Sequence, residues 1–176
     1  MKWILIISIA LLLAACGVQE VAQPLQEEDV ERISDTMPLP DALDTEGIEA
    51  RSEYAGAWLA GGISPYLAFT QQDYEQARAE GKLILLNFYA NWCPICRAEE
   101  PEVFAAFNEL LQENVVGFRV NYRDSETDEA ETALAREFGI SYQHTKVILK
   151  DGKQILKALD SWDRKRYRAE IMKVAE

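Results

Sequence analysis

The stretch KLILLNFYANWCPICRAEEP, residues 82–101, decides the fold. It opens with a continuous apolar run over 82–90, which is typical of a strand buried on both faces of a sheet. Two cysteines, Cys93 and Cys96, follow directly, and from Pro94 to about residue 114 apolar side chains recur at helical spacing. The sequence therefore predicts that a buried strand leads into a long helix, with the cysteine pair at their junction.

Further elements alternate on either side of this unit. The predicted strands cover 66–69, 115–123, 146–150 and 153–159. The predicted helices cover 71–81, with Thr70 as N-cap, 126–138, and a last segment capped by Asp160 or Ser161. Alternation implies parallel strands joined by crossover helices, and Asp151-Gly152 predicts a final hairpin that adds an antiparallel edge. We expect an α/β fold with a central mixed sheet of four to five strands flanked by helices.

A pair of cysteines separated by two residues can bind metal, attach haem, form a structural bridge or carry out redox chemistry. Structural zinc needs four Cys or His ligands, whereas Cys93 and Cys96 have only His144 to join them. Attachment of c-type haem needs His directly after the second cysteine, and position 97 is Arg. A structural bridge that closes so short a loop stabilises little. Redox catalysis is the favoured interpretation, ahead of the structural bridge and of zinc.

The predicted position of the pair suits redox chemistry. Cys93 falls at a helix N-terminus, where unpaired N–H groups and the helix dipole favour an anion and so lower a thiol pKa. Pro94 fits the first helical position, where its missing N–H costs nothing. We expect Cys93 to be the more exposed, nucleophilic thiol and Cys96 to be the more buried, resolving thiol.

These residues resemble a known family. Trp92-Cys93-Pro94-Ile95-Cys96 is similar to the WCxxC site of the thioredoxin superfamily, and Pro101 matches the proline within its active-site helix. Phe138-Gly139-Ile140 and Lys150-Asp151-Gly152 match downstream landmarks, so the resemblance covers about 66–176. It implies the thioredoxin fold and a protein thiol-disulfide oxidoreductase that acts on disulfides or dithiols of other proteins.

Two residues indicate a branch of that family. Asn87 stands where cytoplasmic thioredoxins carry a buried aspartate, and Glu99 lies three residues after the second cysteine. Both features resemble the membrane-tethered, extracytoplasmic TlpA and ResA type. Asn87 is expected to be a buried hydrogen-bonding group. Glu99 either assists proton transfer to Cys96 or is an exposed helix acid paired with a base.

Two more residues near the cysteines carry alternative interpretations. Trp92 either shapes a surface for partner proteins or serves as a packing aromatic. His144 occupies the position of the family's cis-proline, and a cis bond before a non-proline residue costs about 2.5–4 kcal/mol. We therefore expect a trans Gln143–His144 bond. The imidazole either contacts the Cys93 sulfur or only fills the loop.

The first residues, MKWILIISIALLLAAC, have the charged start, apolar stretch and small residues of an export signal. The end of this stretch resembles a bacterial lipoprotein signal, in which the chain is cut before a cysteine that then carries lipid. Residues 1–15 are therefore interpreted as a signal peptide and Cys16 as the site of lipid attachment. The expected location is extracytoplasmic, as a membrane-anchored lipoprotein in the periplasm or on the outer cell surface, where disulfides persist.

The acidity of the chain is concentrated after this signal. The whole sequence has 18 basic and 30 acidic residues, a net charge of −12, and residues 16–64 hold 11 of the acids with two bases. Such a segment is expected to form a disordered tether before a thioredoxin-like domain over 65–176. Nucleic-acid binding is excluded as a function class, because it needs clustered Lys and Arg.

The sequence therefore predicts a membrane-anchored oxidoreductase that reduces disulfides in exported proteins through a Cys93–Cys96 dithiol/disulfide cycle. Its expected partners are disulfide or dithiol proteins, the membrane through the lipid anchor, and a membrane electron donor. No cofactor or resident metal is expected. The alternative is a copper metallochaperone, because two thiolates and the imidazole of His144 suit Cu(I).

Overall fold

The computed structural model describes residues 54–175. The strands are β1 (Trp58–Ala60), β2 (Tyr66–Ala68), β3 (Leu83–Tyr89), β4 (Val115–Asn121), β5 (Lys146–Lys150) and β6 (Lys153–Ala158). The helices are α2 (Gln71–Ala79), α3 (Pro94–Glu109), α4 (Glu129–Glu137) and α5 (Arg164–Ala175). The predicted signal peptide, Cys16 and the tether up to residue 53 lie outside the described residues.

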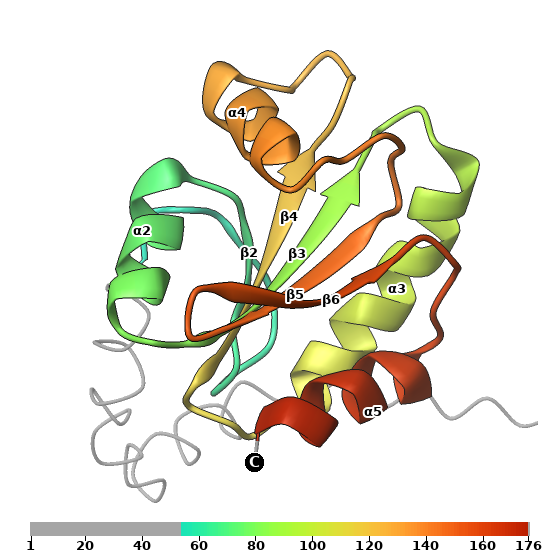
Figure 1. Ribbon diagram of the computed structural model, residues 1–176. Coiled ribbons are helices and arrows are strands. Elements are labelled where there is room, and N and C mark those ends of the chain that lie inside the picture. Colours follow the sequence, from blue (N-terminus) through green and yellow to red (C-terminus); the bar gives the residue numbers. More distant parts are fainter. Residues whose placement is uncertain (1–53, 176) are drawn as a thin grey trace, which may run out of the picture. The chain divides into compact units, whose positions relative to one another are not determined.

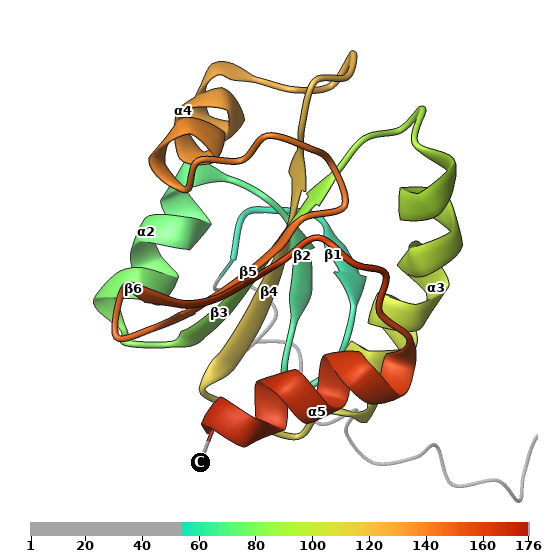
Figure 2. The ribbon, with the colours of Figure 1, turned by 45° about the vertical axis from the view of Figure 1, so that its right-hand side comes forward.

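The strands form one mixed sheet in the order β1-β2-β4-β3-β5-β6. Strands β2, β4 and β3 are parallel, while β5 runs antiparallel to β3 and to β6. Helices α2 and α4 cover one face, and α3 and α5 cover the other (Figures 1 and 2). The predicted α/β architecture is confirmed, with six strands in place of four to five.

The additional strand lies within the segment that was expected to be tether. β1 pairs with β2, and the N–H groups of Ala55 and Gly56 donate to the buried carboxylate of Asp73 at 2.9 and 2.7 Å. The folded domain therefore begins by residue 54 and not at 65. A three-residue strand in a glycine-rich segment gives no period-two signal, which is why the sequence pattern missed it.

Three helix ends differ from expectation. Helix α3 ends at Glu109, not near 114, because Leu110 is already extended. Helix α4 begins at Glu129, not at 126, because Asp128 and Glu131 form a capping box. At the start of α5, Asp163 accepts the N–H of Arg166 at 2.8 Å, in place of the expected Asp160 or Ser161. Thr70 caps α2 as predicted.

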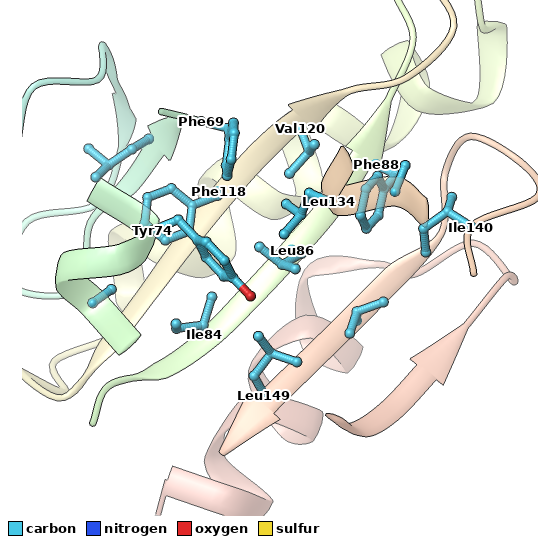
Figure 3. Packing of buried hydrophobic residues seen from close by; sticks show 14 of the residues in the cluster. Phe69, Tyr74, Ile84, Leu86, Phe88, Phe118, Val120, Leu134, Ile140 and Leu149 are labelled. Carbon is cyan, nitrogen blue, oxygen red and sulfur yellow. The ribbon is translucent and has the colours of Figure 1, made fainter. Parts of the chain in front are cut away.

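Each face of the sheet carries its own core. Beneath α2 and α4 the core is rich in aromatic and branched residues, and Phe69, Tyr74 and Phe118 meet there (Figure 3). Beneath α3 and α5 the buried aromatic residues are Tyr66, Phe107, Trp162 and Tyr167. Within residues 54–175, no helix is both long enough and apolar enough to cross a bilayer.

Candidate active site

The cysteine pair lies at the junction that the sequence predicted, after β3 and at the start of α3 (Figure 1). Cys93 and Cys96 form a disulfide with a Cα–Cα distance of 5.3 Å. Cys93 is the N-cap of α3, Pro94 follows in the first turn, and the Cys93 sulfur accepts the N–H of Cys96 at 3.2 Å. The helix N-terminus therefore donates a backbone N–H to the Cys93 sulfur and favours a thiolate there.

Both cysteines are buried in this disulfide form, with exposed fractions of 2% for Cys93 and 4% for Cys96. The expectation that Cys93 is the more exposed residue is therefore wrong for this form. The physical reason is that the bonded pair packs as a unit against Ala90 and Tyr89 at the end of β3. The chemical difference between the two sulfurs comes from the N-cap position of Cys93, not from exposure.

The turn before the disulfide is held by the loop that follows β4. The backbone N–H of Asn91 donates to the Asp124 carboxylate at 2.9 Å, and the Asn91 amide donates to the hydroxyl of Ser125 at 3.0 Å. The Trp92 indole N–H donates to the carbonyl of Arg123 at 3.0 Å. Burial raises the pKa of Asp124, but the hydrogen bonds from Asn91, Thr127 and neighbouring N–H groups outweigh it and hold that pKa below its usual value.

Trp92 is fixed at its N–H and is 53% exposed. Ile95, between the two cysteines, is 47% exposed. Tyr142, also exposed, lies in the turn before β5, whose first residues pair with the end of β3. An orienting hydrogen bond on an exposed ring favours the interpretation of Trp92 as part of a partner surface over that of a packing aromatic.

Asn87 is buried in β3, and its amide donates to the hydroxyl of Tyr66 at 3.1 Å. This confirms the expected buried hydrogen-bonding role. Burial raises the pKa of Tyr66, so its hydroxyl stays protonated at physiological pH. At the position where cytoplasmic thioredoxins carry a buried aspartate, this chain therefore has a neutral side chain, that of Asn87.

Glu99 is 6% exposed and faces the sheet from α3, so the expectation of an exposed helix acid is wrong. Its Oε1 atom lies 2.5 Å from Nζ of Lys146 and accepts the N–H of Trp162 at 2.5 Å. The hydroxyl of Tyr167 lies 3.4 Å from the same oxygen. The pairing with a base, which was also expected, is present, but in the interior.

Lys146 is the functional candidate that sequence reasoning missed. It has no exposed surface, and its ammonium also donates to the carbonyl of Asp160 at 3.0 Å. Burial lowers the pKa of Lys146, and the neighbouring Glu99 carboxylate opposes this change. A lysine at the head of the apolar run KVILK is a signal, since lysine is almost never fully buried without a partner.

His144 lies in the turn that precedes β5, with a left-handed φ of 52°. All peptide bonds of residues 54–175 are trans, so the expected trans Gln143–His144 bond is confirmed. The N–H of Phe88 donates to the carbonyl of Thr145 at 2.9 Å, which holds this turn beside the end of β3. The His144 Nδ1 atom is buried and has no hydrogen-bond partner in the described domain. A contact between its ring and the Cys93 sulfur stays a prediction.

An open pocket of about 700 Å³ lies between α3 and the start of α5. Ile95 and Glu99 line one side, while Trp162 and Arg166 line the other. Among residues 54–175, no cluster of three or more His, Cys, Asp or Glu side chains is placed to hold a metal ion. The copper alternative therefore gains no support from the arrangement of the described side chains.

A comparison with protein families matches residues 65–173 to the model named Thioredoxin. Among curated proteins, the chain is 31% identical over 81 residues to Thioredoxin H4 of Arabidopsis thaliana. It is 35% identical over 74 residues to the thiol:disulfide interchange protein DsbE of Pasteurella multocida, and 38% identical over 77 residues to the thioredoxin-like protein YneN of Bacillus subtilis. These matches cover 46%, 42% and 44% of this chain. They cover 62%, 36% and 43% of the three relatives, which is less than two thirds of each.

Solved structures show the same fold. A thioredoxin from Aeropyrum pernix superimposes with a TM-score of 0.53 at 19% identity, over 70% of this chain and 98% of that one. The protein Trxlp from Edwardsiella tarda gives 0.51 at 23% identity, over 59% of this chain and 95% of that one. With the family model matching residues 65–173 around the Cys93–Cys96 disulfide, the chain belongs to the thioredoxin family.

Proposed function

We propose that this protein is a membrane-anchored, extracytoplasmic thiol-disulfide oxidoreductase that reduces disulfides in exported proteins. One observation carries the redox part: the Cys93–Cys96 disulfide lies at the N-terminus of α3, with exposed apolar side chains next to it. The names of two relatives, a thiol:disulfide interchange protein and a thioredoxin-like protein, agree with this chemistry. The anchor and the location rest on the sequence of residues 1–16.

In the reductive direction, the Cys93 thiolate attacks one sulfur of a partner disulfide. A Cys93–partner disulfide forms, and the other partner sulfur leaves as a thiolate that takes up a proton. Cys96 then loses its proton and attacks the Cys93 sulfur, which releases the second partner thiol and forms the Cys93–Cys96 disulfide. The partner gains two electrons and two protons, and the cysteine pair loses them. A dithiol protein must then reduce the Cys93–Cys96 disulfide by the reverse sequence, which restores the two electrons and two protons.

The exposed rim explains how a partner can be held during this exchange. Trp92 and Ile95 flank the disulfide, and Tyr142 lies in the turn beside the end of β3. Aromatic residues at a protein surface supply large contact areas with little loss of side-chain freedom. The rim is therefore suited to an extended, partly apolar segment around the partner's cysteine.

The redox step is tested with reduced protein and insulin, whose disulfides serve as the probe substrate. Wild-type protein should reduce insulin with dithiothreitol as electron source. Cys93→Ser should lose this activity entirely, while Cys96→Ser should accumulate a mixed disulfide that a reductant cleaves. Full activity in Cys93→Ser, or a mixed disulfide through Cys96 in its place, would overturn the assigned roles.

The anchor is tested separately by fractionation of cells that produce the full chain. Wild-type protein should sediment with membranes and carry the mass of a lipid on Cys16. The Cys16→Ser variant should move to the soluble fraction and keep its insulin-reducing activity. Wild-type protein that is soluble and carries no added mass at Cys16 would contradict the anchor without affecting the redox assignment.

A further inference from the structure

A row of polar side chains crosses the sheet behind the disulfide. Asn87 of β3 is paired in register with Arg119 of β4 on one side and with Lys146 of β5 on the other. Residues paired across neighbouring strands point to the same face of a sheet. The face beneath α3 therefore carries a cation, a neutral amide and a second cation in one line.

Helix α3 places two successive acids opposite this row. Glu99 pairs with Lys146 at 2.5 Å, and Glu100 pairs with Arg119 at 2.9 Å. The first pair is buried, and the side chains of the second are about one quarter exposed. Since both glutamates lie in the second turn of the helix that Cys93 caps, the two ion pairs join the active-site end of α3 to the sheet.

Both pairs lie close to the disulfide in the fold. Cys96 and Glu99 are three residues apart on the buried side of α3, so they are neighbours on the helix surface. The Arg119 guanidinium lies 5.1 Å from the centre of the Tyr89 ring, and Tyr89 packs against the two cysteines. Charges at these positions therefore act on the sulfurs through the low-dielectric interior, with little screening by salt.

We propose that the Glu99–Lys146 and Glu100–Arg119 pairs set the charge behind the disulfide, and thereby set the acidity of Cys93 and the redox equilibrium of the Cys93–Cys96 pair. This rests on the proposed redox function of that pair. Each glutamate cancels a cation that would otherwise stabilise a thiolate. Lys146 and Arg119 are positioning residues in this account, because they act through the charge of the site and touch no partner.

The sign of each effect follows from electrostatics. Removal of a glutamate charge leaves a cation facing the site, which stabilises the Cys93 thiolate and the reduced pair. The variant should then have a more acidic Cys93 and should be a stronger oxidant. Removal of Lys146 or Arg119 leaves an unpaired carboxylate, so the shifts reverse. A unit charge at roughly 10 Å, at an effective dielectric constant of about 20, changes the thiolate equilibrium by up to roughly 15-fold.

Other charged groups lie at the same end of the domain and also contribute to the electrostatic environment of the cysteines. They are Arg97 on α3, Arg123, Asp124 and Glu126 after β4, His144 before β5, Asp160 before α5 and Arg166 on α5. All of them are present in each variant and in the wild type. A difference between variants therefore reports the altered pair.

The test compares Glu99→Gln, Lys146→Met and the double variant. Cys93 alkylation by iodoacetamide is followed against pH, and the disulfide is equilibrated with a series of glutathione buffers. Glu99→Gln should shift the alkylation midpoint to lower pH, and Lys146→Met should shift it to higher pH. Their equilibrium constants with glutathione should move in opposite directions by up to roughly 15-fold, with the double variant close to wild type.

A matched control lies on the same helix. Glu109 pairs with Arg164 and Arg168 at the far end of α3, so Glu109→Gln removes an ion-paired acid far from the disulfide and should change neither readout. If Lys146→Met does not fold, the partly exposed second pair supplies the test, with Glu100→Gln and Arg119→Met expected to shift in opposite directions. Equilibration with glutathione needs no protein substrate, so this test is independent of insulin reduction.

A role in helix packing alone would loosen α3 in both single variants. It would move both readouts in one direction, or lower stability without moving either. Single variants that shift together, or folded variants that match wild type in pH profile and in glutathione equilibrium, would overturn the proposal.

Discussion

The two faces of strand β3 differ at the point where the strand meets the active site. Toward α2 and α4 it presents Ile84, Leu86 and Phe88, which all belong to the core shown in Figure 3. Toward α3 the strand presents Leu83 and Leu85 and then Asn87, with Lys146 and Arg119 on either side. One face of the strand stays apolar to its end, whereas the other becomes polar just behind the disulfide.

This difference separates stability from chemistry. Asp73 and Glu131 are buried carboxylates on the first face; each lies in the first turn of its helix and accepts backbone N–H groups. On the second face a side-chain carboxylate meets a side-chain ammonium in the interior. A buried ion pair is often no more stable than apolar residues of the same volume. Its position behind the cysteines is therefore better explained by an effect on redox chemistry than by an effect on folding.

The largest expected change in stability is on the apolar face. Phe118 is fully buried and meets Phe69 and Tyr74 edge to face. Phe118→Ala should lower the free energy of unfolding by about 3–5 kcal/mol, measured by urea denaturation, because it removes a ring and leaves a cavity. The glutathione equilibrium of the folded protein should stay at the wild-type value. A shift of that equilibrium would show that the two faces are not separate.

A somewhat smaller effect is expected at Gly117 on the other face. A Cβ atom there would lie 2.4 Å from Cζ of Phe107 and 2.6 Å from Cδ2 of Tyr66, closer than side chains tolerate. Gly117→Ala should therefore cost about 3 kcal/mol in urea denaturation through overpacking. Because the Tyr66 hydroxyl accepts the Asn87 amide, displacement of Tyr66 should also change Cys93 alkylation. Unchanged stability and alkylation would contradict this packing.

Asp73 attaches the segment before β1 to the rest of the domain. Its buried carboxylate accepts the N–H groups of Ala55 and Gly56, so Asp73→Ala leaves these donors unpaired. The expected loss is about 2 kcal/mol. Residues 54–60 should become sensitive to protease, and the redox equilibrium should stay unchanged because the cysteines lie at the start of α3, which covers the other face of the sheet. Continued protection of this segment would show that β1 stays paired without the hydrogen bonds to Asp73.

The smallest expected effect is a pH-dependent change in stability through Asp124, which accepts the backbone N–H of Asn91. The pKa of Asp124 is lowered in the folded protein, so its contribution to stability is present above the unfolded value of about 3.8 and is lost as pH falls through the folded pKa. Asp124→Asn should therefore reduce stability at neutral pH, and the difference from wild type should shrink as pH falls below the unfolded value of about 3.8. A difference that is constant from about pH 2 to 7 would rule out the charge of Asp124 as its cause.

The sequence was informative where chemistry and periodicity coincide. The buried strand, the junction with Cys93 and Cys96, Pro94 at the helix start and the final hairpin are local patterns, and the structure contains each of them. The left-handed Asp151 and Gly152, with φ values of 53° and 69°, form the predicted turn. Local backbone preferences fix these features before any long-range contact forms.

The parts that could not be predicted depend on contacts between distant residues. Lys146 lies far along the chain from Glu99, and only strand register together with helix packing brings the two together. The same holds for Trp162, whose backbone N–H binds Glu99, and for the attachment of Ala55 to Asp73. No sequence period records such pairs. A lysine inside an apolar strand indicates that it has a buried partner, but the sequence does not show which residue that partner is.

In the proposed function, Cys93 and Cys96 exchange two electrons as a pair. The most direct test is intact mass spectrometry of the full chain after equilibration with glutathione buffers and alkylation. We expect two populations only, one with no label on Cys93 and Cys96 and one with both labelled, which exchange in a single two-electron transition. A dominant singly labelled species at equilibrium, or a disulfide that stays intact under reducing buffers that open ordinary dithiol enzymes, would contradict it.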